Sequence, residues 1–353
     1  MGFFIFEKKI EMRKYFLFQL FVIASFSFGQ KLTFQTLLKD KISIRAIQVW
    51  DDKVYYAGTD SKFGYASLKD TLDKKQIKLS EDKLQFRTLS QDHENFYAIN
   101  IGSPANFYQI NKNTFEYKVI HKDETKNAFY DVLYFYKNKF YTFSDPESTL
   151  NLKLAEFSVY NKQFHSKYFS DYKMNEGEAA FAASNSNISA KGNFVWLATG
   201  GKSSRIFRLN LKTQKIEVFK TSFIQGTASQ GIYSIDFHDT KFGIAVGGDY
   251  TKQAENINNI ATTHDGGVTW QIEASGKNGG YKTCVKFRPG SKGKEIIAVG
   301  DQNIEFSNDY GKTWTTISEE KNLYICEWVN KNTLVFAGKD KILKASISDI
   351  SKK

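Results

Sequence analysis

Helical periodicity, proline and cysteine are all scarce in this sequence of 353 residues. Beyond the first thirty residues no stretch repeats its apolar side chains with the period of a helix, which argues against a helical protein. Only three prolines and two cysteines occur, so neither a proline-rich linker nor a disulfide-dense scaffold is indicated. Tyrosine (19) and phenylalanine (31) are abundant, and 41% of the residues are hydrophobic. Because aromatic residues favour strands, the composition predicts an all-β protein with a large core.

Signatures of metal, cofactor and nucleic-acid sites are also missing. The five histidines have no ligand spacing, and neither a Cys-x-x-Cys pair nor a glycine-rich strand-to-helix loop occurs. We therefore predict no catalytic residues, no metal and no cofactor. The formal net charge of +11 suits acidic partners or anionic lipid, or else a lysine-rich solvated surface. No nucleic-acid motif accompanies this charge, so we expect no nucleic-acid partner.

Residues 1–29 have the pattern of a signal peptide. A basic start at residues 12–14 is followed by the apolar run YFLFQLFVIASFS at residues 15–27. Small residues precede Gln30, where we expect cleavage. Residues 1–11 are interpreted as an upstream extension of the start, and an uncleaved membrane anchor is the alternative. The prediction is an exported protein, either periplasmic or secreted.

The two cysteines, Cys284 and Cys326, would suit one disulfide in an exported protein. The register of the repeats argues against this pairing. If Phe287 and Trp328 occupy matching places, Cys284 is one residue out of step with Cys326 and lies on the opposite face of its strand. We therefore predict two unpaired thiols.

Two octapeptides share the frame Ser/Thr-x-Asp-x-Gly-x-Thr-Trp: THDGGVTW at residues 263–270 and SNDYGKTW at residues 307–314. In a turn the Asp accepts hydrogen bonds from backbone N–H groups, the Gly permits a positive φ, and Thr-Trp opens the next strand. The frame resembles the Asp-box of β-propellers, which is a structural hairpin tip and not a catalytic site. Its residues here are Thr263, Asp265, Gly267, Thr269 and Trp270, and again Ser307, Asp309, Gly311, Thr313 and Trp314.

Seven strand–turn–strand units follow one another along the chain. They occupy residues 44–58, 84–102, 129–144, 181–200, 232–247, 281–300 and 323–338. Their ends lie about 40 to 55 residues apart, which is typical of four-stranded propeller blades. The last unit leaves room for three strands only, so a strand at residues 31–38 would complete it and close the ring. We predict that residues 30–353 form a single seven-bladed β-propeller with four-stranded blades, closed by this N-terminal strand.

Longer stretches carry a resemblance to one family of propellers. They are LQFRTLS (84–90), YAINIGSPANFYQI (97–110), FYDVLYFYKNKFYTFSDP (129–146), EGEAAFAASNSNISAKGNFVWLATGGKSSRIFR (176–208) and GTASQGIYSIDFHDTKFGIAVGGDYTK (226–252). The chain resembles bacterial exported propellers related to the photosystem II assembly and stability factor, the Ycf48/Hcf136 group, whose members are often named oxidoreductases. The resemblance implies a propeller that assists assembly by binding a protein partner, and an arginine-rich patch is implicated in the photosynthetic relatives.

Two enzymatic alternatives have less support from the residues. Sialidases also carry Asp-boxes on a propeller, but the mature chain has few arginines and lacks their early Arg-Ile-Pro signature. A glycosidase in general needs two carboxylates that flank the scissile bond. A glycan-binding or sialidase-type propeller is kept as the alternative function, and an oxidoreductase as a weaker one.

Charged residues near the ends of the predicted strands define a candidate binding site. In a propeller such positions converge on one mouth of the central channel, where polar groups can bind a ligand. The alternative is that they pair as arginine–carboxylate ties between blades. We predict a non-catalytic, monomeric scaffold whose arginines contact acidic groups of a protein partner, with a glycan as the alternative partner. The candidate residues are Arg45, Arg87, Asp145, Glu178, Arg205 and Asp249.

Overall fold

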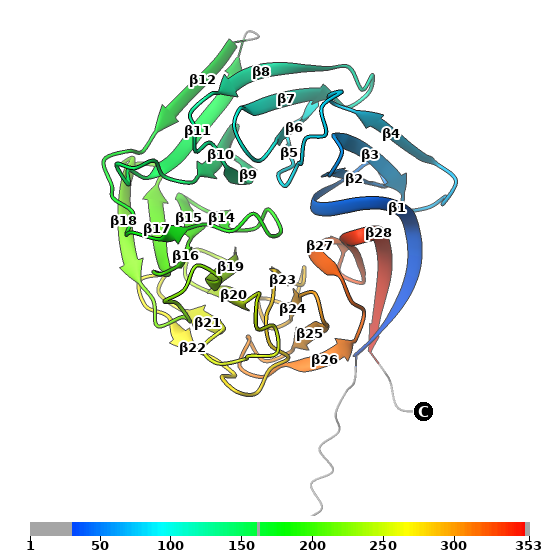
Figure 1. Ribbon diagram of the computed structural model, residues 1–353. Coiled ribbons are helices and arrows are strands. Elements are labelled where there is room, and N and C mark those ends of the chain that lie inside the picture. Colours follow the sequence, from blue (N-terminus) through cyan, green and yellow to red (C-terminus); the bar gives the residue numbers. More distant parts are fainter. Residues whose placement is uncertain (1–29, 161–162, 350–353) are drawn as a thin grey trace, which may run out of the picture.

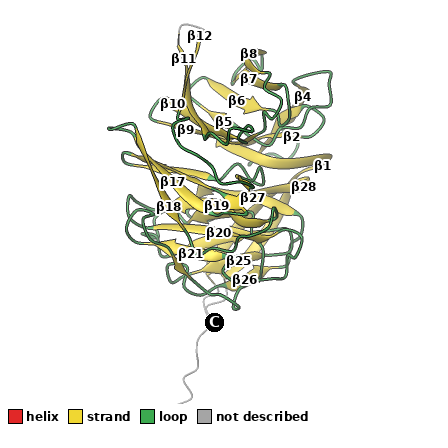
Figure 2. Cartoon of the chain, turned by 60° about the vertical axis from the view of Figure 1, so that its left-hand side comes forward, coloured by secondary structure: helices red, strands yellow, loops and turns green. Residues whose placement is uncertain are grey.

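The protein is a ring of β-sheets (Figure 1). The computed structural model describes residues 30–160 and 163–349, and the predicted signal peptide lies outside them. The described residues form strands and loops (Figure 2), with no helix long and apolar enough to cross a membrane. The all-β propeller predicted from the strand–turn–strand period is therefore confirmed.

The described residues form six sheets, of which four have four strands. One six-stranded sheet has the order β27 (Leu323–Asn330), β28 (Thr333–Asp349), β1 (Gln30–Trp50), β2 (Lys53–Gly58), β3 (Lys62–Ser67) and β4 (Lys74–Lys78). The other is β13 (Glu178–Ala179), β16 (Gly200–Gly201), β19 (Gln230–Phe237), β20 (Gly243–Asp249), β21 (Ile260–Thr263) and β22 (Gln271–Ile272).

The four-stranded sheets contain strands that follow one another along the chain, with short breaks. The first two are β5 (Ser90–Gln91), β6 (Asn95–Ile99), β7 (Ala105–Asn111) and β8 (Tyr117–Asp123), then β9 (Tyr130–Tyr136), β10 (Lys139–Ser144), β11 (Lys153–Tyr160) and β12 (Gln163–Tyr168). The other two are β14 (Ile188–Lys191), β15 (Phe194–Ala198), β17 (Arg205–Asn210) and β18 (Lys215–Lys220), then β23 (Cys284–Phe287), β24 (Ile296–Val299), β25 (Ile304–Ser307) and β26 (Thr315–Ser318).

The prediction of seven blades is wrong, because the structure has six. Each predicted unit contains its antiparallel strand pair, but the first and last units are not separate sheets. They are joined by β1, a single strand of 21 residues. Its N-terminal part pairs with β28, and its C-terminal part pairs with β2. One sheet of six strands therefore stands where two blades were predicted.

The two ends of the described chain lie side by side in this sheet (Figure 1). Residues from Gln30 to Ser43 pair antiparallel with residues from Asp349 back to Lys339. The predicted pairing of an N-terminal strand with the last unit is thus present, and it removes two edges that would otherwise be free to pair with another chain.

The core lies between neighbouring sheets. The inner strands bury most of their apolar side chains, whereas outer strands such as β12 and β26 are largely exposed. Consecutive sheets share one hydrophobic cluster. For example, Tyr55 of β2 packs on Phe96 of β6 with ring centroids 4.2 Å apart. Stacking sheets face to face in this way is the physical reason that aromatic residues are so numerous in the sequence.

The two octapeptide turns have the geometry predicted for them. Asp265 accepts hydrogen bonds from the backbone N–H of Val268 (3.0 Å) and from both the N–H (2.9 Å) and hydroxyl (2.6 Å) of Thr269. Gly267 has a φ of 88°, where a side chain would be strained. Asp309 accepts the equivalent bonds from Thr313. Both turns lie at hairpin tips, after β21 and β25, and away from the channel residues described next.

Candidate functional site

Seven strands surround a central channel and run from one of its mouths towards the other. They are β1, β5, β9, β14, β19, β23 and β27. In β1 and β19 the earlier residues lie nearer one mouth, and the later residues lie nearer the other. Arg45 and Tyr233 line a cavity at the first mouth, whereas Gln48 and Asp236 of the same two strands line a second cavity. We call the first cavity the arginine mouth and the second the distal cavity.

The arginine mouth is an aromatic pocket with two cations in its wall and a volume of about 280 Å³. Tyr233 stacks on Phe181 with ring centroids 3.9 Å apart, and it meets Tyr281 edge-on at 4.8 Å. The complete lining is Arg45, Arg87, Phe181, Ala182, Ala183, Tyr233, Tyr250, Gln253, Tyr281 and Asp301. Rigid aromatic walls with a few charged groups are typical of recognition pockets.

Arg45 and Arg87 lie close enough to repel one another. Burial, followed by the charge of Arg45, lowers the pKa of the Arg87 guanidinium. Arg45 donates one hydrogen bond to the carbonyl of Ala183 (3.0 Å), and its Cζ lies 4.0 Å from the ring centroid of Tyr324. Within the described residues neither guanidinium forms an ion pair with a carboxylate. Most of their N–H donors are therefore available to an anionic group that enters the mouth.

One carboxyl group, that of Asp301, balances part of this charge. Burial raises the pKa of Asp301, while the hydrogen bond from Gln253 Nε2 (2.9 Å) and the charge of Arg45 act in the opposite direction. Asp131, outside the lining of this mouth, acts on Arg87 in the same way, since its charge raises the pKa of the Arg87 guanidinium.

The other predicted site residues do not join this mouth. Arg205 instead forms a bidentate pair with Glu178, with its Nε 3.0 Å from each carboxylate oxygen. The Glu178 side chain is fully buried, and it also accepts a hydrogen bond from the Thr199 hydroxyl (2.6 Å). Asp249 accepts the N–H and hydroxyl of Thr251 in a local turn. Arg205 and Glu178 therefore form an arginine–carboxylate tie, which was the alternative to a binding site, and Asp249 caps a local turn.

Asp145 is half-buried, and its carboxyl group lies near that of the fully buried Asp131. One oxygen of each group, Asp131 Oδ2 and Asp145 Oδ1, is buried without a hydrogen-bond partner among the described residues. Burial and then the charge of Asp145 raise the pKa of Asp131 well above its usual value, and burial raises the pKa of Asp145 to about 6. Neither carboxyl lines the arginine mouth or the distal cavity.

Residues 181–187 cross the channel and separate its two cavities. In Figure 1 the loop that leads into β14 projects into the centre of the ring. Asn185 Nδ2 donates to the carbonyls of Leu89 (2.8 Å) and Leu133 (3.2 Å), and its Oδ1 accepts the N–H of Leu133 (2.8 Å). Ser184 donates to the carbonyl of Thr283 (2.5 Å). We call this segment the plug, since its hydrogen bonds reach strands on several sides of the channel.

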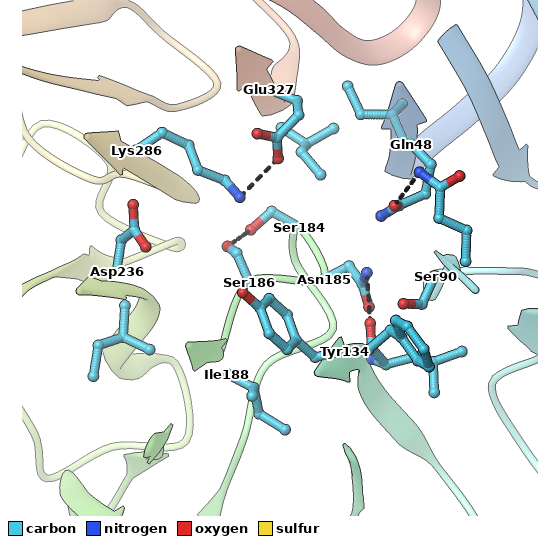
Figure 3. A pocket seen from close by; sticks show the side chains of 16 residues that line it. Gln48, Ser90, Tyr134, Ser184, Asn185, Ser186, Ile188, Asp236, Lys286 and Glu327 are labelled. Atoms are coloured by element: carbon cyan, nitrogen blue, oxygen red, sulfur yellow. Dashed lines mark hydrogen bonds and ion pairs between the residues drawn. The ribbon is translucent and has the colours of Figure 1, made fainter. Parts of the chain in front are cut away.

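The distal cavity lies beyond the plug and has a volume of about 360 Å³ (Figure 3). Its polar side chains point to one space from different strands, and Lys286 Nζ lies 2.8 Å from Glu327 Oε2. The sequence analysis missed this site. The sequence does contain a pattern that indicates this site. Several innermost strands have a polar residue at the same position, directly before an aromatic or aliphatic residue, as in Asp236-Phe237 and Lys286-Phe287.

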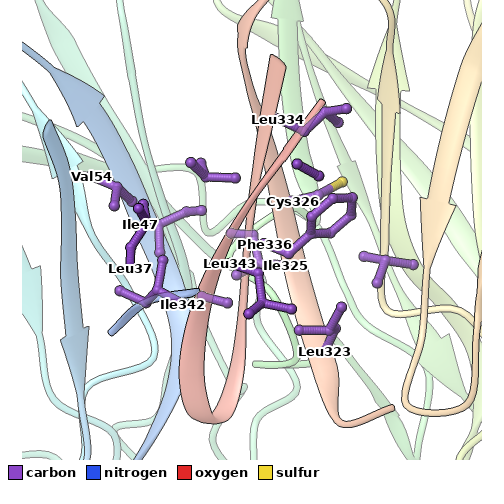
Figure 4. Packing of buried hydrophobic residues seen from close by; sticks show 14 of the residues in the cluster. Leu37, Ile47, Val54, Leu323, Ile325, Cys326, Leu334, Phe336, Ile342 and Leu343 are labelled. Carbon is purple, nitrogen blue, oxygen red and sulfur yellow. The ribbon is translucent and has the colours of Figure 1, made fainter. Parts of the chain in front are cut away.

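The two cysteines face each other across neighbouring strands, contrary to the prediction of opposite faces. Cys284 of β23 and Cys326 of β27 are fully buried, and their sulfur atoms lie 4.0 Å apart. Figure 4 shows Cys326 within the hydrophobic cluster around the six-stranded sheet that contains β27, β28 and β1. Both thiols are free, as predicted, although the register argument behind that prediction is wrong.

The ring of sheets and its channel define the protein as a β-propeller. No protein-family model and no curated protein sequence matches the chain. Among solved structures it is similar to Ycf48 bound to a D1 peptide, with a TM-score of 0.62 and 11% identity over 90% of this chain and 97% of that one. It is similar to Ycf48 from Cyanidioschyzon merolae, with a TM-score of 0.65 and 12% identity over 88% and 98% of the two chains. It is also similar to the structure of U3-55K, with a TM-score of 0.62 and 10% identity over 89% of this chain and 98% of that one.

These similarities establish the propeller fold. Ycf48 structures are among the neighbours of this chain, in line with the resemblance read from the sequence. Membership of that family stays a prediction, because sequence identities near one in ten show a shared architecture and leave function to the site itself.

Proposed function

We propose that the protein is a non-catalytic binding or assembly propeller that holds an acidic segment of a protein partner at the arginine mouth. The observation that carries this proposal is the convergence of Arg45 and Arg87 on one aromatic pocket without a carboxylate ion pair. A glutamate or aspartate side chain would accept bidentate hydrogen bonds from either guanidinium. The solved structure of Ycf48 with a D1 peptide is an example of a propeller of this architecture that binds a peptide.

The position of the carboxyl groups disfavours hydrolysis at this mouth. Glycoside hydrolysis needs two carboxylates that reach the scissile bond from opposite sides. The arginine mouth contains one, Asp301, and the carboxyl groups of Asp131 and Asp145 do not line it. Binding is therefore the function that the geometry of this cavity supports best.

Fluorescence anisotropy with labelled peptides tests the proposal. The probe is a short peptide that alternates glutamate with glycine, and its comparison peptide has glutamine at every glutamate position. We expect the glutamate peptide alone to bind, and the variant Arg45→Gln/Arg87→Gln to weaken binding about tenfold or more, since charge-assisted hydrogen bonds are lost.

A matched control removes two positive charges elsewhere. Lys118 and Lys312 are exposed and form no ion pair within the described residues, so Lys118→Gln/Lys312→Gln lowers the net charge equally. This variant should keep its affinity within about twofold, the additivity expected for distant sites. Equal weakening by both double variants would reduce the effect to net charge and would contradict a site at the arginine mouth.

We also propose that the protein is exported to the periplasm or secreted, on the strength of the signal-like residues 1–29. Expression of the full chain with a C-terminal tag, followed by fractionation and N-terminal sequencing, tests this point. The expected product begins at Gln30 outside the cytoplasm. A cytoplasmic product that retains residue 12 would contradict it.

A further inference from the structure

The distal cavity is a second, separate site. It is bounded by the later residues of the innermost strands, and the plug stands between it and the arginine mouth. Its volume of about 360 Å³ falls within the range of about 300 to 1,000 Å³ that is typical of small-molecule sites. The size suits a small molecule and leaves no room for a folded partner.

The charged groups of this cavity already have partners. Lys286 pairs with Glu327 at 2.8 Å. Asp236 accepts the backbone N–H of Phe237 (2.9 Å) with one oxygen and that of Phe287 (3.1 Å) with the other. A charged ligand would therefore have to compete with existing ion pairs and hydrogen bonds, which favours a neutral ligand.

Neutral polar groups are what the cavity leaves open. Gln91 Oε1 lacks a hydrogen-bond partner among the described residues, but it has no exposed surface and cannot be reached by a ligand in the cavity. The open groups are the hydroxyls of Ser90 and Tyr134, which form no hydrogen bond with other described residues. The Ser90 and Tyr134 hydroxyls face the same space and can both donate and accept (Figure 3).

Aliphatic side chains complete the wall between these polar groups. Ile47, Leu133, Ile188, Ile235 and Ile325 come from five of the innermost strands. A sugar ring presents hydroxyl groups at its edge and C–H groups on its faces, so it matches a wall that alternates in this way. A purely apolar molecule would displace water from the Ser90 and Tyr134 hydroxyls without replacing its hydrogen bonds.

We propose that the distal cavity binds a neutral, polyhydroxylated molecule of monosaccharide size. The Ser90 and Tyr134 hydroxyls form hydrogen bonds with hydroxyl groups of the ligand. Because the plug separates the cavities, this binding is independent of the peptide site proposed above.

Calorimetry and saturation-transfer NMR with the whole mature protein test this assignment. The probes are D-glucose, D-galactose, D-mannose and the sugar alcohol D-mannitol, each up to about 10 mM. We expect at least one to bind with a Kd on the order of 1 mM or tighter. Tyr134→Phe and Ser90→Ala, which each remove one open hydroxyl, should each weaken binding about tenfold. No binding by any probe would overturn the assignment and leave the cavity to water.

Two controls make the result specific. Arg45→Gln/Arg87→Gln should bind the sugar within about twofold of the unmodified protein, because distant sites act additively. Protonated D-glucosamine should bind less tightly than glucose. Tighter binding of the amine would overturn the neutral-ligand assignment. Sugar binding that survives both Tyr134→Phe and Ser90→Ala, in variants with unchanged thermal unfolding, would overturn it as well.

Discussion

Removal of the Asn185 side chain should strongly destabilise the propeller, because this one residue ties the plug to two strands. Asn185 is 9% exposed and makes three hydrogen bonds, two to β9 at Leu133 and one to the carbonyl of Leu89, next to β5. At about 1 kcal/mol of net stabilisation for each bond, Asn185→Ala should cost about 3 kcal/mol. Its φ of 55° adds about 1 kcal/mol, since alanine tolerates left-handed backbone less well than asparagine.

Urea unfolding followed by tryptophan fluorescence and by far-UV circular dichroism measures this change. The expected loss for Asn185→Ala is about 4 kcal/mol, which corresponds to a fall in Tm of about 6 °C with an unfolding entropy near 2.1 cal/mol/K per residue. Asn185→Gly is the matched control. It removes the same hydrogen bonds but accepts the positive φ, so it should be about 1 kcal/mol less destabilising.

The two variants separate the causes. A loss below about 1 kcal/mol in both would show that the hydrogen bonds of the plug contribute little and would refute this reasoning. Equal losses of unfolding free energy in the two variants would support the contribution of the hydrogen bonds and would contradict a contribution from the positive φ of residue 185.

Three further predictions concern charged groups. Asp265→Ala should lower stability by about 1 to 2 kcal/mol at pH 7, because the hydrogen bonds of the turn are lost. These hydrogen bonds outweigh burial and lower the pKa of the Asp265 carboxyl. The difference in Tm between the variant and the unmodified protein should therefore shrink below about pH 4. Arg205→Met should cost about 3 to 5 kcal/mol in urea unfolding by leaving the buried Glu178 carboxylate unpaired, and adding Glu178→Leu should recover part of the loss; a double variant less stable than the single one would contradict this account. The pKa of Asp145 is raised to about 6 from an unfolded value near 3.9, so this group favours folding below pH 4 and loses that contribution as pH rises through 6. Asp145→Asn should therefore flatten the fall in Tm between pH 4 and pH 6. An unchanged slope of Tm against pH would contradict this prediction.

Local pattern was sufficient to place the strand pairs. The unit predicted at residues 129–144 corresponds almost residue for residue to β9 and β10, because its alternation and its turn are encoded within sixteen neighbouring residues. The turn of Asp265 was predictable for the same reason, since its hydrogen bonds span four residues.

Long-range pairing was not predictable from such patterns. The sequence suggested separate strands at residues 31–38 and from Ile44, but the chain runs through both as β1 and bonds to both of its neighbours. No local feature distinguishes this arrangement from two strands in two blades, because the deciding partner lies about three hundred residues away in β28.

Of the candidate site residues, Arg45 and Arg87 line one cavity, and their role in binding stays a prediction. Arg45 lies within β1, and Arg87 lies three residues before β5. Arg205 has a similar local context but finds Glu178, and only the fold reveals that partner. The plug was concealed within a predicted strand unit, although asparagine and serine at residues 184–187 favour loops over strands.

The pairing of β1 with β28 also has a consequence for the order of events during synthesis. The strand that is synthesised first acquires its outer neighbour only when residues 339–349 have been made. Until then β1 presents an open row of backbone donors and acceptors, to which strands of other unfinished chains can pair. Completion of the ring is thus a late event that depends on contacts of very high sequence separation, which makes folding slow. Until the final strand has been synthesised, the nascent chain needs a chaperone or another means of keeping β1 from pairing with other chains.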